Sequence, residues 1–290
     1  MPLPCHHEER VTDQVQPTVE LLRDLDLLHP DVLQDHCIEP TDYREGLVFR
    51  SAVESIRGQF IASSSTGRQG LVRDVLNSLV NKGYLAEYEQ RSSRARHDFT
   101  VMVSRSPEYF MALEVKGGEG NSINISERPL WAKEFCVWCH LDGAVVNQPA
   151  HGAHSIINRV TSELVRRGKQ VDALFFKDAL CGTRTRPCPK YRKSQEQVGL
   201  QAAPDVFLFP QRVPSADDPE PPIHTLETLR FPKLLLEIFD VQPAERPVHT
   251  WEVHVKVTKL DDGRYRRIVE VLHDGRKVDE STSRPWRESQ

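Results

Sequence analysis

The chain has 290 residues, a formal net charge of −4 and the composition of an ordinary globular protein. The length predicts one large domain or two modest ones, and the weak negative charge excludes a protein that binds nucleic acid through bulk positive charge. We find no apolar stretch long enough to span a membrane and no apolar signal-peptide core at the N-terminus, so we expect a cytoplasmic protein.

Helices are expected first along the chain. Short helical pieces are predicted over 1–45, and another over 46–61, which carries Glu54. The clearest helix spans 67–82, because its apolar residues form a one-sided stripe. Thr66 and Gln69 at its start are typical of a capping box.

Three strands and a glycine-rich loop come next. The strands are predicted over 84–90, 98–104 and 109–116, and the polar loop follows over 117–130. Residues 131–141 fit either a helix or an apolar strand. A helix over 153–167 and a strand over 171–176 then give the order helix, three strands, helix, strand.

The remainder of the chain is rich in strand signals. Strands are predicted over 205–209 and 234–241, and a hairpin over 251–273 turns at Asp261-Asp262-Gly263. The last ten residues are expected to be loose. We therefore divide the chain into an N-terminal helical segment, a central core and a β-rich C-terminal extension packed on that core; the ranges are 1–65, 66–212 and 213–290.

Three charged residues in the central strands carry the strongest functional signal. Glu114 and Lys116 are two apart in a strand, so their side chains point to the same face. Asp98 begins the neighbouring strand. Two carboxylates bind a hard divalent cation, and the lysine can hold a water or a phosphate. The pattern predicts metal-dependent cleavage of a phosphodiester bond; a plain surface Glu–Lys pair is the alternative.

The same pattern suggests the ligands of the metal. Asp98 and Glu114 are expected to bind Mg²⁺, or Mn²⁺ as a substitute, together with the backbone carbonyl of Val115. Asp74 and Glu54, on upstream helices, are candidates for an additional metal or a supporting contact.

Asp98, the triplet Glu114-Val115-Lys116 and the surrounding order of elements resemble the PD-(D/E)xK nuclease superfamily over about residues 66–177. His97 stands where that motif has proline, and Pro204-Asp205 comes too late in the chain to supply the first acid. The resemblance implies a restriction-endonuclease-like α/β core, a mixed αβββαβ central sheet flanked by helices, with extra N-terminal helices.

The chain is most similar in kind to type II restriction endonucleases. That resemblance implies Mg²⁺-dependent cleavage of double-stranded DNA at a specific sequence, a homodimer, and a cognate methyltransferase in the same system. Two alternatives stay open: a repair or defence nuclease that acts on DNA structure or modification, and a non-catalytic DNA-binding protein of the same fold.

Two polar segments are candidates for DNA contacts. Donors and acceptors in the loop beside the proposed metal site could hold phosphates or read base edges; they are Asn121, Ser122, Asn124, Ser126 and Arg128. The basic segment 181–193 adds Arg184, Arg186 and Lys190. Ordinary solvated loops are the alternative for both segments.

Four of the six cysteines could form a second kind of site. Cys136 and Cys139 have the spacing of half a zinc knuckle, and Cys181 and Cys188 would form the other half with an unusually wide gap. The apolar surroundings of Cys136 and Cys139 equally fit buried thiols. A disulfide framework is not expected in a cytoplasmic chain.

Overall fold

The computed structural model describes residues 9–46, 48–49, 65–92, 95–117, 123–140, 149–176 and 203–287. Contacts between residues divide the chain into two units, Met1–Glu54 and Ser55–Gln290.

The N-terminal unit is a small group of helices, which confirms the short helical pieces expected there. Its helices are α1 (Glu9–Arg23), α2 (Leu25–Leu28), α3 (Pro30–Asp35) and α4 (Pro40–Arg44). Leu33 and Tyr43 are its buried apolar residues, and the Tyr43 hydroxyl donates a hydrogen bond to the Leu22 carbonyl. The expected helix over 46–61, Glu54 included, lies almost wholly outside the described residues.

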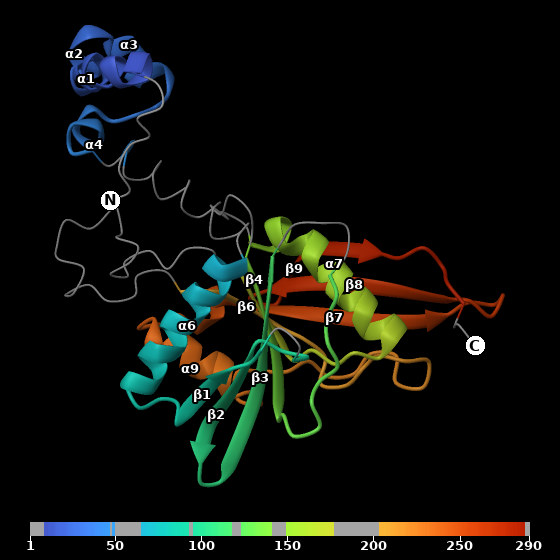
Figure 1. The fold of residues 1–290 in the computed structure, drawn as a ribbon. Coiled ribbons are helices and arrows are strands. Elements are labelled where there is room, and N and C mark those ends of the chain that lie inside the picture. Colours follow the sequence, from blue (N-terminus) through green and yellow to red (C-terminus); the bar gives the residue numbers. More distant parts are fainter. Residues whose placement is uncertain are drawn as a thin grey trace. The chain divides into compact units, whose positions relative to one another are not determined.

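The larger unit is built on a nine-stranded sheet in which the strands lie in sequence order (Figure 1). The strands are β1 (Glu87–Gln90), β2 (Phe99–Arg105), β3 (Glu108–Gly117), β4 (Glu134–His140), β5 (Ala173–Phe176), β6 (Asp205–Leu208), β7 (Thr250–Lys259), β8 (Tyr265–His273) and β9 (Arg276–Thr282). The pairs β3–β4, β4–β5 and β6–β7 are parallel and the others antiparallel. The protein is thus of the mixed α/β kind, and the C-terminal strands extend the central sheet.

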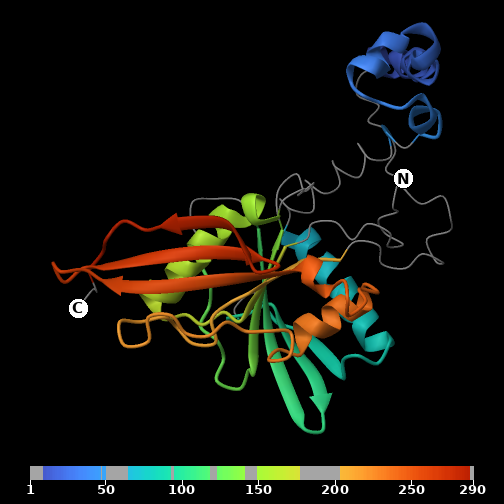
Figure 2. The ribbon, with the colours of Figure 1, turned by 180° about the vertical axis from the view of Figure 1, so that it is seen from behind.

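Helices cover both faces of this sheet. They are α6 (Ser65–Asn81), α7 (Pro149–Arg167), α9 (Phe231–Ile238) and the short 3-10 helix η1 (Arg246–His249). Helices α6 and α9 lie side by side over β1–β3, whereas α7 crosses one face of β7–β9 (Figures 1 and 2). Among the described residues, no helix has the length and apolar character needed to cross a membrane.

Two apolar clusters, one on each face, fix which way the strand residues point. Met111 and Leu113 of β3 pack in the cluster with α6 and α9, while Ala112 packs in the cluster with α7. Because alternate strand residues face opposite sides, Glu114 and Lys116 lie on the same face as Ala112. Burial of the apolar stripe of α6 therefore fixes the orientation of β3.

Most of the expected elements are present, and the undecided segment 131–141 contains strand β4 (Glu134–His140). Strand β4 lies between β3 and β5, parallel to both. The described order from α6 to β5 is thus one helix, four strands, one helix and one strand. The expected three-strand order lacked β4, because its short apolar run has no distinctive period.

The strand expected over 234–241 is wrong, because α9 occupies most of that range. Pro232 stands in the first turn of α9, where its missing N–H is tolerated. Phe231, Leu235 and Ile238 are buried at helical spacing. A nearly continuous apolar run hides this spacing from a sequence reading, because every position also fits a buried strand.

The expectation of a loose C-terminal end is also wrong as far as residue 287. Strand β9 pairs with β8 after a turn in which Asp274 and Gly275 both have positive φ, 50° and 69°. This two-residue turn matches the twist of a hairpin. Trp286 then forms an isolated bridge with Tyr265. The sequence of β9 is mostly polar, so it lacks the apolar alternation typical of a strand.

A buried carboxylate attaches α9 to the sheet. Glu134, at the start of β4, has no exposed surface. It accepts hydrogen bonds from the Tyr109 hydroxyl at 2.6 Å and from the backbone N–H groups of Arg230 and Phe231 at 2.5 and 3.0 Å. Burial raises the pKa of Glu134. Glu134 thus binds the N-terminal end of α9, where N–H groups lack partners within the helix.

Candidate active site

The three predicted catalytic residues meet at one edge of the sheet. Strands β3, β4 and β5 all end there, and β2 and β6 begin there. The pairing places Lys116, Cys139, Phe176 and Asp205 in one row across four strands. The carboxyl ends of parallel strands are a recurrent ligand position in α/β proteins. Helix α6 reaches this edge through Gln69, which is described below.

Glu114 and Lys116 form an ion pair at this edge. The Lys116 Nζ lies 2.5 Å from the Glu114 Oε1, and the Glu114 side chain is 3% exposed while that of Lys116 is 29% exposed. The prediction that these side chains share a face is confirmed. A carboxylate this deeply buried requires partners, and the ammonium group is one of them.

The loop after β3 supplies the other partners of Glu114. The Ser126 backbone N–H donates to the Glu114 Oε2 at 3.1 Å, and the Ser126 hydroxyl donates to Oε1 at 3.4 Å. Ile123 and Ile125 are buried in the cluster with α7. This packing holds the loop across the face of the sheet. The described part of the loop thus helps to position the carboxylate.

Asp98 makes hydrogen bonds to the β3 residues directly before and after Glu114. Its backbone N–H donates to the Leu113 carbonyl at 3.1 Å, and its Oδ2 accepts from the Val115 N–H at 2.7 Å. Its Oδ1 accepts from the Gln69 amide at 2.7 Å. Main-chain and side-chain bonds thus hold the first acid of the motif beside the strand that carries the second.

Gln69 is the site residue that the sequence reading missed. Its side chain was expected to complete a capping box, but it donates to Asp98 and accepts a hydrogen bond from the Gln90 amide at 3.2 Å. The available signal was its place in the first turns of the helix that precedes the Asp98 strand. An amide can donate to a carboxylate without adding negative charge, so Gln69 orients Asp98 at no electrostatic cost.

The donor set suits a hard cation. Asp98 and Glu114 each offer carboxylate oxygens with lone pairs beyond those used in the hydrogen bonds above, and the Val115 carbonyl directly follows Glu114 in the chain. Mg²⁺ is commonly held by one or two carboxylates plus oxygens of the substrate. In the described part of the chain, no group of three or more His, Cys, Asp or Glu side chains gathers as a metal site. Two carboxylates are thus what the described residues provide.

Of the two upstream acids, Asp74 is described, and it does not join Asp98 and Glu114 in a group that could hold a metal. Asp74 is exposed on α6, and its charged neighbour is Arg73. Partial burial of its carboxyl group raises the pKa of Asp74. Glu54 lies outside the described residues.

The predicted DNA contacts of the loop that are described have partners within the protein. Asn124 is exposed, and its Oδ1 accepts from the Lys169 Nζ at 3.4 Å. The Arg128 guanidinium lies 3.1 Å from the Asp172 carboxylate and also donates to the carbonyls of Ala132 and Lys133. Arg128 thus has a structural role within the protein. Its contact with DNA stays a prediction. Ser126 donates to Glu114. The remaining predicted contacts lie outside the described residues; they are Asn121, Ser122, Arg184, Arg186 and Lys190.

The placement of two cysteines argues against the zinc site. Cys136 is buried in the cluster with α6, and Cys139 is buried in the cluster with α7, on the other face of the sheet. Side chains three apart in a strand point to opposite faces, so these two thiols cannot bind one metal. Burial raises the pKa of Cys136 well above its ordinary value, which opposes the thiolate that zinc requires. Cys181 and Cys188 lie outside the described residues.

No family model, curated protein or solved structure matches this chain.

Proposed function

We propose that this chain is a Mg²⁺-dependent endonuclease that hydrolyses phosphodiester bonds of double-stranded DNA at a specific sequence, as type II restriction endonucleases do. The observation that supports the proposal is the joint placement of Asp98, Glu114 and Lys116 at one sheet edge. Neither a plain structural ion pair nor a surface charge pair accounts for the third residue, Asp98, and its two side-chain hydrogen bonds to β3 and α6.

Each residue has a distinct task in this proposal. Asp98, Glu114 and the Val115 carbonyl would hold Mg²⁺, which when bound polarises the scissile phosphate and activates a water. Lys116 holds the attacking water or the phosphate. Its ammonium group has three donors, and the contact with the Glu114 Oε1 uses one of them. The half-exposed position of Lys116 leaves the other two available to a substrate.

The arrangement of the core is compatible with a restriction-endonuclease-like fold. Helix α6 precedes the antiparallel strands β1–β3, and α7 leads to β5, which is parallel to its neighbour β4. Strand β4 is an addition to the expected αβββαβ order. The proposal includes a homodimer on a palindromic site, because two-fold protein symmetry matches two-fold DNA symmetry. A methyltransferase of the same specificity would protect the host DNA.

A digest of plasmid DNA with the purified chain tests the proposal directly. We expect fragments of fixed length with Mg²⁺ and none with EDTA. Mapping the fragment ends would give the recognition sequence. Smears without fixed ends would favour a nuclease that recognises structure, and uncut methylated and unmethylated DNA at saturating Mg²⁺ would contradict an active endonuclease.

Replacing Gln69 should weaken the metal site without removing a ligand. In Gln69→Ala, the Asp98 carboxylate loses the donor that orients it, so we expect half-maximal cutting to require about 10 to 100 times more Mg²⁺. Cleavage rates measured across a Mg²⁺ titration check this. Asn81→Ala, at the exposed end of the same helix, is the matched control. An unchanged Mg²⁺ midpoint in Gln69→Ala would show that Gln69 does not position Asp98 for metal binding.

A further inference from the structure

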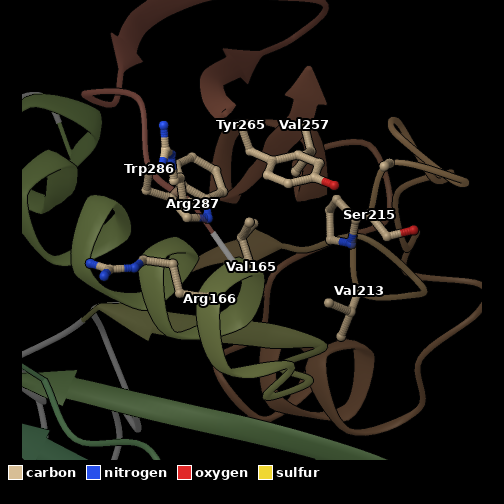
Figure 3. A pocket seen from close by; sticks show the side chains of 10 residues that line it. Val165, Arg166, Val213, Ser215, Val257, Tyr265, Trp286 and Arg287 are labelled. Atoms are coloured by element: carbon tan, nitrogen blue, oxygen red, sulfur yellow. The ribbon is translucent and has the colours of Figure 1, made fainter. Parts of the chain in front are cut away.

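A small pocket lies far from the candidate active site, between the end of α7 and the β7–β8 hairpin. Its volume is about 190 Å³. Figure 3 shows Arg166, Trp286 and Arg287 on one side of it and Val213 and Ser215 on the other, with Tyr265 between them. The lining residue Val257 lies seven residues along β7 from Thr250, or roughly 23 Å at the rise of a strand. Strand β7 begins at the edge that carries Lys116, so the pocket is at the opposite edge.

A buried arginine stands directly beside this pocket. Arg267 of β8 pairs with Val257 and lies two residues from Tyr265, so it shares a face with both of these lining residues. It is 9% exposed. Its backbone N–H donates to the Ser283 hydroxyl at 3.0 Å, and its carbonyl accepts from the Ser283 N–H at 2.9 Å. The main chain of Arg267 is thus fixed.

The positive charge of Arg267 has no counter-ion among the described residues. No described carboxylate lies within ion-pair distance, and its Nε is buried without a hydrogen-bond partner. Burial, and then the nearby charge of Arg166, lower the pKa of Arg267 to about 10. Arg267 therefore stays protonated at neutral pH, and a buried unpaired charge is costly.

Three described acids that are close in sequence to residues lining the pocket bind other cations. Glu163, one turn before Arg166 in α7, lies 3.3 Å from Arg167 and 3.1 Å from Lys169. Asp218 of the loop that borders the pocket pairs with Arg212 at 2.8 Å. Asp262 of the hairpin turn pairs with Arg264 at 2.6 Å. Among the described residues, Arg166 and Arg267 therefore have no acidic partner.

We propose that this pocket binds a phosphate group, with the guanidinium groups of Arg267 and Arg166 as its cationic donors and Tyr265 and Trp286 as its walls. Guanidinium groups bind phosphate oxygens bidentately. These two cations, with the exposed Arg287 of the lining as a third, match the charge of about −1.5 to −2 on a phosphate monoester better than the single charge of a carboxylate. The volume of the pocket is below the ~300 Å³ at which sites for drug-sized ligands begin, so it suits a phosphate group and not a whole nucleotide.

Thermal unfolding with inorganic phosphate tests this proposal. At constant ionic strength, 20 mM phosphate is expected to raise the Tm of the full chain by about 3 °C relative to chloride. Arg267→Met and Arg166→Met should abolish that rise. Arg166 is exposed, so its replacement leaves the fold intact. Arg276→Met, an exposed arginine of β9, is the matched control and should keep the rise.

A second experiment distinguishes a terminal phosphate of a nucleic acid from free inorganic phosphate. Binding of a 5′-phosphorylated duplex is compared with binding of the same duplex without the terminal phosphate, in EDTA. A terminal phosphate that strengthens binding only when Arg267 is present would identify a nucleic-acid end, whereas a response to inorganic phosphate alone would identify a free phosphate. Either result supports the site. No phosphate response in either arm, or a response that survives both arginine variants, would overturn it. Lys116→Ala should retain the response whether or not the chain is a nuclease.

Discussion

Lys116→Ala is expected to lower Mg²⁺-dependent cleavage of duplex DNA by about 100-fold or more. The lysine is the cation placed within 2.5 Å of the proposed metal ligand Glu114, and it faces the edge where the strands end. Without it, only the bound Mg²⁺ would be left to stabilise the attacking water and the developing negative charge on the phosphate. Single-turnover cleavage of a plasmid at saturating Mg²⁺ is the measurement.

The same substitution should also lower stability, because Glu114 would stay buried without its counter-ion. Lys116→Arg separates the two effects. It keeps a positive charge beside Glu114 but carries a planar group in place of a compact ammonium, so we expect wild-type folding with impaired cutting. Lys133→Ala, an exposed lysine at the opposite edge of the sheet, is the control. A folded Lys116→Ala protein that cuts at the wild-type rate would refute the catalytic assignment.

Of the proposed substitutions, Asp172→Ala should lower the free energy of unfolding most, by about 3 to 5 kcal/mol. The Asp172 side chain is 1% exposed. It accepts from the Phe135 N–H at 2.7 Å, from Arg128 at 3.1 Å, and from His224 and Gln170 at 3.2 Å each. Truncation leaves a guanidinium and a buried N–H without their partner. Urea unfolding followed by circular dichroism measures the loss.

The exposed ion pair between Asp218 and Arg212 provides the comparison. Asp218→Ala removes an ion pair of similar length at the surface, and such pairs contribute about 0 to 1 kcal/mol. A double-mutant cycle of Asp172→Ala with Arg128→Ala should show strong coupling, because each residue satisfies the other. Equal losses in the free energy of unfolding for Asp172→Ala and Asp218→Ala would contradict the structural role of the buried Asp172 carboxylate.

The sequence predicted those elements whose residues repeat with a clear period. The apolar stripe of 67–82 indicated α6, and the turn at Asp261-Asp262-Gly263 indicated the hairpin of β7 and β8. The period of two in a strand also placed Glu114 and Lys116 on one face, which is confirmed by their ion pair. These features depend on neighbours within a few residues, so local physics decides them.

Elements without a clear period could not be predicted in this way. The run that forms α9 is apolar at nearly every position, and the polar run that forms β9 has little alternation. Each adopts its structure because of a partner outside its own residues. The carboxylate of Glu134 binds the start of α9, and the completed edge of β8 offers a ladder to β9.

The sequence by itself thus determined that this chain carries an acid and a lysine on one strand face, after a helix and a strand that begins with Asp98. Only the tertiary structure decided that Gln69 orients Asp98, that Arg128 is used by Asp172, and that Cys136 and Cys139 lie on opposite faces. The reason is physical. A side chain's face follows from the backbone repeat, but its partner depends on which distant segment the burial of apolar surface brings beside it.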